Sequence, residues 1–215
     1  MSCRQHAGRR PKIRRVALDE QLLRFLNDHQ SRQANDAVVL VMQLGSNRLL
    51  AALAVLAVVV VVARRWYQPG LAVAIAVPAA TLTANLLKLV FDRARPPLEL
   101  ALLHVGGPSM PSTEAARTSA AAMALLLAVR WSGPAARRCA AALLGLGLLT
   151  VGLSMVYLGA HWASDVVAGW ALGLTIGAAA ALSCRSAFGR LTALGTAAAV
   201  RPPAVGSRPD GPAGP

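Results

Sequence analysis

The chain contains 215 residues, of which 55% are hydrophobic and only 14% are charged. Because soluble domains carry about 25% charged residues, this composition argues against a soluble enzyme, and it is too apolar for a disordered chain. The net charge is +13, but the basic residues flank apolar runs and form no stripe with interleaved aromatic residues. This placement favours membrane-flanking charge over nucleic-acid binding. Cys3, Cys139 and Cys184 are too few and too scattered for a disulfide framework or a zinc site.

The first 47 residues contain no long uninterrupted apolar run. Residues 1–15 are polar and basic, and we expect a disordered tail there. Residues 16–47 place apolar side chains such as Leu22, Leu23 and Leu26 near helical spacing. Crossing a hydrocarbon core of about 30 Å takes about 20 apolar residues. The segment is therefore predicted to form an amphipathic helix lying in the membrane interface.

Five apolar segments follow within residues 48–190, and several carry small residues at close spacing, which allows tight helix packing in lipid. Residues 191–215 are rich in Ala, Gly and Pro without a periodic pattern, and we expect a disordered tail. The predicted fold class is an all-α integral membrane bundle of five or six transmembrane helices with an amphipathic amino-terminal helix. The predicted spans are Leu49–Ala63, Leu71–Phe91, Thr113–Val129, Cys139–Leu158 and Val166–Ser183.

Arginines gather at alternate ends of these segments and orient the bundle. Residues 64–65, 130–138 and 185–190 carry this charge, and the positive-inside rule places them in the cytoplasm. Residues 92–111 and 159–164 then face the extracytoplasmic side. Five spans would also place the basic amino terminus outside, against the same rule. Either residues 16–47 form a poor sixth crossing or the tail is an exception, and the interfacial helix is favoured.

Ionisable residues collect on the side opposite these arginines, where charge near lipid marks a functional site. Lys88, Arg93 and Arg95 lie at and beyond the end of the second predicted span. His161 and Asp165 are four residues apart at the start of the last one and share a helix face. A carboxylate there can fix the imidazole tautomer and raise the basicity of the other nitrogen. Cations beside such a pair suit a phosphate group.

These blocks resemble the three motifs of the type-2 phosphatidic acid phosphatase family of integral membrane lipid phosphatases. Residues 88–96 (KLVFDRARP) match K-x6-R-P, and residues 111–114 (PSTE) occupy the place of P-S-G-H. Residues 154–165 (SMVYLGAHWASD) resemble S-R-x5-H-x3-D. The order, the spacing and the span-end positions of the motifs agree with the family. The similarity extends over about residues 36–185.

The resemblance implies a role for each matching residue. His161 would attack phosphorus and form a phosphohistidine, and Asp165 would orient and activate it. Lys88 and Arg95 would bind phosphate oxygens. Ser112 and Thr113 would bind phosphate at the amino end of the third predicted span, where the helix dipole favours anions. The reaction would be hydrolysis of a phosphate ester or pyrophosphate without a metal or cofactor.

The chain departs from the family pattern at two functional positions. Glu114 and Thr113 replace the histidine and glycine of the second motif, and a glutamate can replace the general acid only when it is protonated. Met155 replaces a phosphate-binding arginine of the third motif, and losing one such clamp could slow the reaction roughly a hundredfold. Arg93 and Arg117 are candidate auxiliary residues for that function. His104, in the connecting loop, is a further candidate for the acid, although a solvated loop histidine is the favoured interpretation.

The sequence therefore predicts a multi-pass cell-membrane phosphatase with its site on the extracytoplasmic side. Its substrate would be a polyprenyl phosphate or pyrophosphate, phosphatidic acid or phosphatidylglycerol phosphate. Membrane lipids are its expected surroundings, and no nucleic-acid partner is expected. The alternative is a catalytically impaired lipid-phosphate-binding or assembly protein on the same scaffold, suggested by Glu114 and Met155.

Overall fold

The structure is a computed structural model that describes residues 10–33, 35–36, 38, 59–103 and 105–199. All regular elements within these ranges are helices, which confirms the predicted all-α class. They are α1 (Arg10–Asp28), α4 (Tyr67–Phe91), the 3-10 helix η1 (Leu98–Leu100), α5 (Thr113–Ala128), α6 (Pro134–Tyr157) and α7 (Ala163–Ala199).

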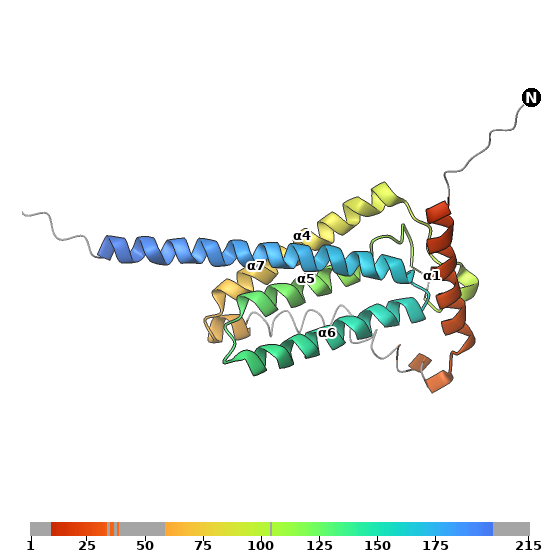
Figure 1. Ribbon diagram of the computed structural model, residues 1–215, viewed down its shortest axis with the longest axis horizontal. Coiled ribbons are helices and arrows are strands. Elements are labelled where there is room, and N and C mark those ends of the chain that lie inside the picture. Colours follow the sequence, from red (N-terminus) through yellow and green to blue (C-terminus); the bar gives the residue numbers. More distant parts are fainter. Residues whose placement is uncertain (1–9, 34, 37, 39–58, 104, 200–215) are drawn as a thin grey trace, which may run out of the picture.

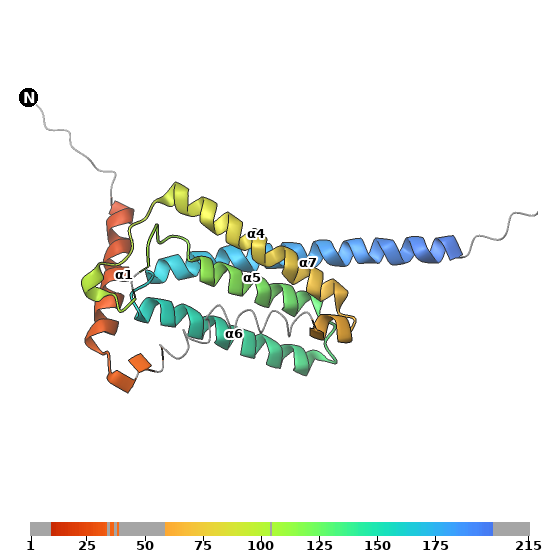
Figure 2. The same ribbon diagram turned by 180° about the vertical axis from the view of Figure 1, so that it is seen from behind.

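The long helices run lengthwise and α1 crosses one end of them. In Figures 1 and 2, α4, α5, α6 and α7 lie along the long axis of the molecule, and α1 lies across the end at which α4 finishes and α7 begins. α4, α5 and α7 all pack against one another, and the contact between α5 and α7 is the most extensive. The transverse direction of α1 is the one expected for a helix in the membrane interface.

Three described helices are long and apolar enough to cross a bilayer: α4, α6 and the part of α7 from Ala163 to Arg190. α5 has 16 residues and is about 24 Å long at 1.5 Å per residue, shorter than the hydrocarbon core. The predicted span Leu49–Ala63 falls mainly in residues 39–58, which lie outside the described residues. The choice between five and six crossings therefore stays a prediction.

Small residues form the contact between the central helices. On α7, a Cβ atom added to Gly169, Gly173 or Gly177 would meet the backbone oxygen of Ser112, Ala116 or Ala120 of α5. Buried alanines recur at every fourth position of α4 and α5, so the backbones approach closely, as small residues permit in membrane helices. These alanines are Ala72, Ala76, Ala80, Ala84, Ala116, Ala120, Ala124 and Ala128.

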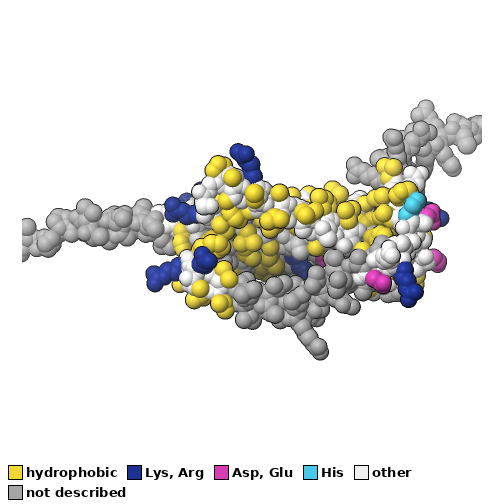
Figure 3. Space-filling view, turned by 90° about the horizontal axis from the view of Figure 1, so that it is seen from below, with side chains coloured by type: hydrophobic (Ala, Val, Ile, Leu, Met, Phe, Trp, Pro, Cys, Tyr) yellow, Lys and Arg dark blue, Asp and Glu magenta, His cyan; other side chains and the backbone are white. Residues whose placement is uncertain are grey.

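The exterior of the bundle carries larger apolar side chains than its centre. Large side chains on α4 and α6 point outward, including Leu82, Leu89, Val90, Leu143 and Leu146, each of which is more than half exposed. Figure 3 shows hydrophobic side chains over the middle of one face and charged side chains gathered toward its two ends. An Ala-rich centre inside a Leu- and Val-rich surface is the arrangement of a bundle surrounded by lipid.

Both predicted tails prove to be partly helical. α1 begins at Arg10, inside the segment 1–15 that was expected to be disordered, and α7 continues to Ala199, into the segment 191–215. Pro11 is tolerated because the first turn of a helix needs no backbone donor there. Residues 191–199 are rich in Ala, Leu and Thr, and alanine has the highest helix propensity. The helices therefore extend beyond the predicted boundaries at 15 and 191.

Candidate functional site

The three motif blocks converge at the end of the bundle that α1 crosses. Lys88 lies in the last turn of α4, and Arg93 and Arg95 follow it in the loop toward η1. Ser112 is the N-cap of α5, and Thr113 and Glu114 begin that helix. His161 lies in the turn between α6 and α7, and Asp165 lies in the first turn of α7. Figure 1 shows these helix ends side by side, and the arginine-bearing α5–α6 turn lies at the opposite end of the bundle.

His161 and Asp165 form a buried pair. Their side chains are 2% and 0% exposed, and Nδ1 of His161 lies 3.6 Å from Oδ2 of Asp165. The other imidazole nitrogen, Nε2, lies 3.4 Å from Nη1 of Arg95. Because a guanidinium can only donate hydrogen bonds, this contact favours a tautomer with the lone pair on Nε2 and the proton on Nδ1, toward Asp165. In this tautomer Nε2 is unprotonated, while Nδ1 faces Asp165 at a distance too long for a hydrogen bond and is buried without a hydrogen-bond partner among the described residues.

A tight turn holds His161 in place. Gly159 has φ of +67°, and an added Cβ would lie 2.5 Å from the carbonyl oxygen of Leu100. Both the left-handed backbone and the close approach require glycine. The backbone N–H groups of Ala160 and His161 donate to the carbonyl oxygen of Met155, at 3.0 and 3.3 Å. The turn therefore packs against the loop that carries Arg95.

Asp165 is anchored by its backbone as well as by its side chain. Its Oδ2 accepts the N–H of Trp162 at 3.0 Å, which caps the first turn of α7. Its carbonyl oxygen accepts the N–H of Ser112 at 3.0 Å. The second and third motifs are thus joined directly.

The basic residues of the first motif differ in their surroundings. Arg95 donates from Nη1 to the carbonyl oxygen of Ala160 at 2.6 Å and from Nε to that of Gly107 at 3.0 Å. Burial lowers the pKa of the Arg95 guanidinium, and the carboxylates of Glu114 and Asp165 oppose that shift. Lys88 interacts electrostatically with Arg95, Glu114 and Asp165, which places its ammonium beside the same site.

Arg93, a candidate auxiliary residue for binding phosphate, contacts carboxylates of the protein. Its Nη1 lies 2.7 Å from Oδ1 of Asp165, and its Nη2 lies 2.7 Å from Oδ2 of Asp19 on α1. The guanidinium carbon also lies 5.6 Å from the ring centroid of Trp162, a cation–π distance. Arg93 therefore binds two carboxylates, and its guanidinium is occupied by protein groups.

The first turn of α5 carries the divergent motif. Ser112 is fully buried, and its Oγ accepts the N–H of Ala115 at 3.4 Å, so its hydroxyl proton stays available for donation. The hydroxyl of Thr113 donates to Asn85 on α4 at 3.2 Å. Glu114 is 35% exposed, and its Oε2 lies 4.0 Å from Nε2 of His161.

The remaining candidate positions are Arg117, Met155 and His104. Nη2 of Arg117 lies 3.8 Å from Oε1 of Glu114, so Arg117 is paired with this carboxylate. Met155 is buried in an apolar cluster with Ala115, Val156 and Val166, so no cation stands at its position. His104 lies outside the described residues.

Sequence reasoning missed Asp19 and Ser164. Asp19 is 74 residues from Arg93 and 145 residues from Ser164 in the chain, yet its carboxylate contacts both. No local pattern links such distant residues. One weak sequence signal for Asp19 exists: it is an acidic residue on an otherwise apolar helix face that includes Leu23 and Leu26.

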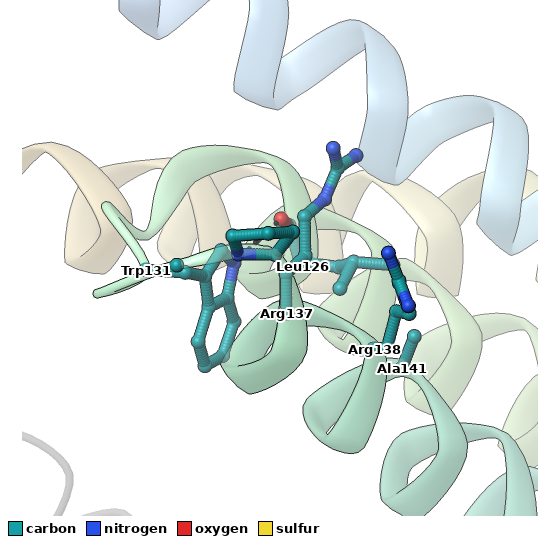
Figure 4. Close-up of a pocket in the computed structure, with 7 residues that line it drawn as sticks. Leu126, Trp131, Arg137, Arg138 and Ala141 are labelled. Atoms are coloured by element: carbon teal, nitrogen blue, oxygen red, sulfur yellow. Dashed lines mark hydrogen bonds between the residues drawn. The ribbon is translucent and has the colours of Figure 1, made fainter.

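An open surface pocket of about 580 Å³ lies at the far end of the bundle, away from the motif residues. Its lining comes from the α5–α6 turn and includes Trp131, Arg137 and Arg138 (Figure 4). None of the motif residues lines it, so it is not assigned to the chemistry. Among the described residues, no three His, Cys, Asp or Glu side chains cluster as metal ligands would.

The fold and the site together define a membrane-embedded helical bundle with a buried imidazole–carboxylate pair beside a basic cluster. Comparison with known families agrees with this class: the model of the PAP2 superfamily matches residues 69–188. The chain belongs to the PAP2 superfamily. That match includes Lys88, Arg95, Ser112, His161 and Asp165.

Two solved structures share this fold. One is described as the first transmembrane PAP2 type phosphatidylglycerolphosphate phosphatase from Bacillus subtilis, with a TM-score of 0.68 and 21% identity over 85% of this chain and 89% of that one. The other is LpxE of Aquifex aeolicus, with a TM-score of 0.62 and 22% identity over 76% of this chain and 94% of that one. None of the curated proteins compared with the chain matches it.

Proposed function

We propose that the chain is a lipid phosphate phosphatase in which His161 is the nucleophile. The observation that carries the proposal is the orientation of the imidazole, with Nδ1 toward Asp165 and Nε2 toward Arg95 at the end of the bundle where all three motifs meet. Membership of the PAP2 superfamily supports it. The likeness to the Bacillus subtilis phosphatidylglycerolphosphate phosphatase supports it as well.

In the proposed first step, Nε2 of His161 attacks phosphorus. The N–P bond forms as the bond to the leaving oxygen breaks, and the leaving group departs with the electron pair. Asp165 stabilises the developing positive charge on the imidazole. Arg95 and Lys88 neutralise the equatorial phosphate oxygens, and the Ser112 hydroxyl and the first backbone N–H groups of α5 donate to them. Thr113 contributes its backbone there, because its hydroxyl contacts Asn85.

In the second step, water attacks phosphorus, the N–P bond breaks, and its electron pair returns to Nε2. Glu114 is the acidic residue nearest to Nε2 among the described residues, at 4.0 Å. We assign it the proton transfers: in its protonated form it donates to the leaving oxygen, and as a carboxylate it accepts the proton of the attacking water. Because a carboxyl group donates a proton only from its protonated form, the first step is expected to be slower for an alkoxide leaving group than for one that needs no proton.

The lipid chain of the substrate would lie against the apolar exterior of the bundle, while its phosphate enters the polar end. The arginines at the opposite end support an extracytoplasmic position for the site, since basic residues favour the cytoplasmic side. The proposed substrates are polyprenyl phosphate or pyrophosphate, phosphatidic acid and phosphatidylglycerol phosphate.

Phosphate release by the purified protein tests the proposal. A panel of these lipid phosphates is incubated with wild-type protein and with the His161→Ala variant. Release by the wild type with loss of at least about a thousandfold in the variant is the expected result. Equal release from both proteins would exclude His161 as the nucleophile.

A second function, binding of a lipid phosphate without turnover, has a specific observation in its favour. The Glu114 carboxylate lies beside Nε2, where it repels an anion, and Met155 supplies no cation. Saturable binding of the lipid phosphates without any release, unaffected by His161→Ala, would favour this alternative.

A further inference from the structure

One charged contact connects the transverse helix α1 to the catalytic pair. We propose that Asp19 is a positioning residue: it fixes the Arg93 guanidinium, which in turn holds Asp165 against His161, so that α1 forms part of the site. This inference rests on the proposed function, and it assigns to α1 a role beyond that of an interfacial helix.

Asp19 uses both carboxylate oxygens at the interface between α1 and the site. Its Oδ1 accepts the backbone N–H of Ser164 at 3.1 Å, and its Oδ2 accepts Nη2 of Arg93 at 2.7 Å as well as the Ser164 hydroxyl. The side chain is only 7% exposed. A carboxylate at that depth requires compensation, and these donors supply it. The Ser164 N–H belongs to the first turn of α7, so Asp19 caps that helix from another part of the chain.

Arg93 carries the connection from Asp19 to Asp165. Its Nη1 donates to Oδ1 of Asp165 at 2.7 Å and to the Ser164 hydroxyl at 2.6 Å, while Nη2 donates to Asp19. The guanidinium is planar and rigid, so fixing one of its nitrogens fixes the position of the other. Trp162 covers one side of the guanidinium and donates from Nε1 to the carbonyl oxygen of Ala94 at 2.9 Å. Arg93 is thus held on three sides.

The charges of Asp19, Arg93 and Asp165 explain why the Asp19 carboxylate is needed beside that of Asp165. An arginine paired with Asp165 alone would neutralise that carboxylate and weaken its effect on the imidazole. Because Asp19 shares the same guanidinium, the group Asp19–Arg93–Asp165 keeps a net charge of −1. Asp165 therefore remains able to stabilise the positive charge that His161 gains on attacking phosphorus.

Apolar contacts hold α1 in the position that this network needs. Leu23, one turn beyond Asp19, is 1% exposed, and Leu26 packs against the cluster that contains Met155 and Val166. Leu18, Leu22 and Phe25 stay exposed on α1. Figure 2 shows α1 crossing the ends of α6 and α7 beside the site. The Asp19 network is therefore part of a docked interface rather than a chance surface pair.

The Asp19→Asn variant of the full-length protein tests the proposal, because it removes the charge at nearly constant volume. Asp19 contacts no group assigned to the phosphate. We therefore expect kcat to fall by about tenfold to a hundredfold, as misplacement of a catalytic group does, with KM for the lipid phosphate largely unchanged. The matched control is Glu20→Gln on the same helix, whose carboxylate forms an exposed pair with Arg24 and whose loss should leave kcat unchanged.

A double-mutant cycle separates positioning through Arg93 from general destabilisation. If Asp19 acts through Arg93, the Asp19→Asn change should cost much less in the Arg93→Gln background than in the wild type. Restoration of most of kcat by Asp19→Glu would support the charge requirement. Two results would contradict the proposal. One is that the losses of kcat from Asp19→Asn and Arg93→Gln simply add, and the other is that Asp19→Asn raises KM and leaves kcat unchanged.

A variant that unfolds is detected by thermal unfolding in detergent, and Ser164→Ala then provides the second test. It removes only the hydroxyl that joins Asp19, Arg93 and α7, and a several-fold loss of kcat is expected. Wild-type kcat in both Ser164→Ala and a folded Asp19→Asn would overturn the role of Asp19. If the wild type and His161→Ala release phosphate equally, the proposed function itself fails, and that outcome is distinct from a failure confined to Asp19.

Discussion

At the scale of single residues, the groups around Nε2 of His161 decide which reactions the site can perform. Arg95 donates toward that nitrogen, and Glu114 stands 4.0 Å from it as the nearest acid among the described residues. Nη2 of Arg117 lies 3.8 Å from Oε1 of Glu114, the other oxygen of that carboxylate. In the proposed mechanism, His161 is the nucleophile and the Glu114 carboxyl group is the proton donor.

Replacing Glu114 by histidine should raise turnover of lipid monophosphates, because an imidazolium donates a proton at neutral pH more readily than a carboxyl group. We expect an increase of about tenfold to a hundredfold for alkyl phosphates. Aryl phosphates, whose leaving groups need no proton, should gain much less. Phosphate release from a series of alkyl and aryl phosphates measures both effects.

Glu99→His is the matched control for this substitution, since Glu99 is exposed on η1 at the same end of the molecule. A fall in activity of Glu114→His, or an equal change for both classes of substrate, would contradict the assignment of Glu114 to proton transfer.

Removing the Arg95 guanidinium should weaken stabilisation of the transition state. The Arg95→Gln variant is expected to lose at least about a hundredfold in kcat/KM, and Arg95→Lys should recover little because a lysine cannot reproduce the contacts of the guanidinium with the carbonyl oxygens of Ala160 and Gly107. Steady-state kinetics on one lipid phosphate measures the loss. Arg64→Gln at the opposite end is the control, and comparable losses in both variants would argue against a specific role for Arg95.

At the scale of elements, close packing of α7 on α5 sets the distance between the motifs. The glycines of α7 lie against backbone oxygens of α5, and the N–H of Ser112 reaches the carbonyl oxygen of Asp165. Widening this contact would separate the first turn of α5 from the imidazole–carboxylate pair. The small residues thus allow the close approach of α5 and α7 on which the proposed site depends.

The Gly173→Val substitution tests this packing. Its Cβ would collide with the carbonyl oxygen of Ala116, and overpacking of this kind costs about 1–3 kcal/mol or more. We expect a lower midpoint of thermal unfolding in detergent. Gly147→Val on α6 is the control, because nothing lies within 4 Å of an added Cβ there. Equal shifts for both variants would show that helix propensity alone is responsible.

The elements that could be predicted from sequence were those with a strong local signal. Apolar runs marked α4, α6 and α7, and the fixed spacing of Lys88, Arg95, His161 and Asp165 marked one end of the bundle. The partners of Arg93 could not be predicted, because Asp19 is far away in the chain and only the docking of α1 brings it close. The helical stretch 191–199 was missed since its Ala-rich sequence lacks the period on which the prediction depended.

At the scale of the whole molecule, charge separates two ends of an apolar bundle. Arg64 and Arg65 precede the start of α4, and Arg130, Arg137 and Arg138 lie at the turn between α5 and α6 and in the first turns of α6. These helix ends lie opposite the end that α1 crosses, where the acidic residues of the site are (Figure 1). Figure 3 shows charged side chains gathered toward the two ends. This polarity supports a site that faces the extracytoplasmic side.

Labelling of cysteines in intact cells tests that orientation. Cys139 is exposed near Arg137 and Arg138, so a membrane-impermeant maleimide should reach it only after permeabilisation. A cysteine introduced by Glu99→Cys at the site end should react in intact cells, in a Cys3→Ser background. Reaction of Cys139 in intact cells, with protection of the introduced cysteine, would reverse the assignment.

The most direct test of the account is to trap the phosphorylated protein. Rapid acid-free quenching of wild-type protein with a lipid phosphate labelled in its terminal phosphate should give a base-stable, acid-labile adduct, and mass spectrometry should place it on His161. The adduct should be absent from His161→Ala. Turnover accompanied by a phosphate adduct on another residue, or by the same adduct in His161→Ala, would contradict the claim that this imidazole attacks phosphorus.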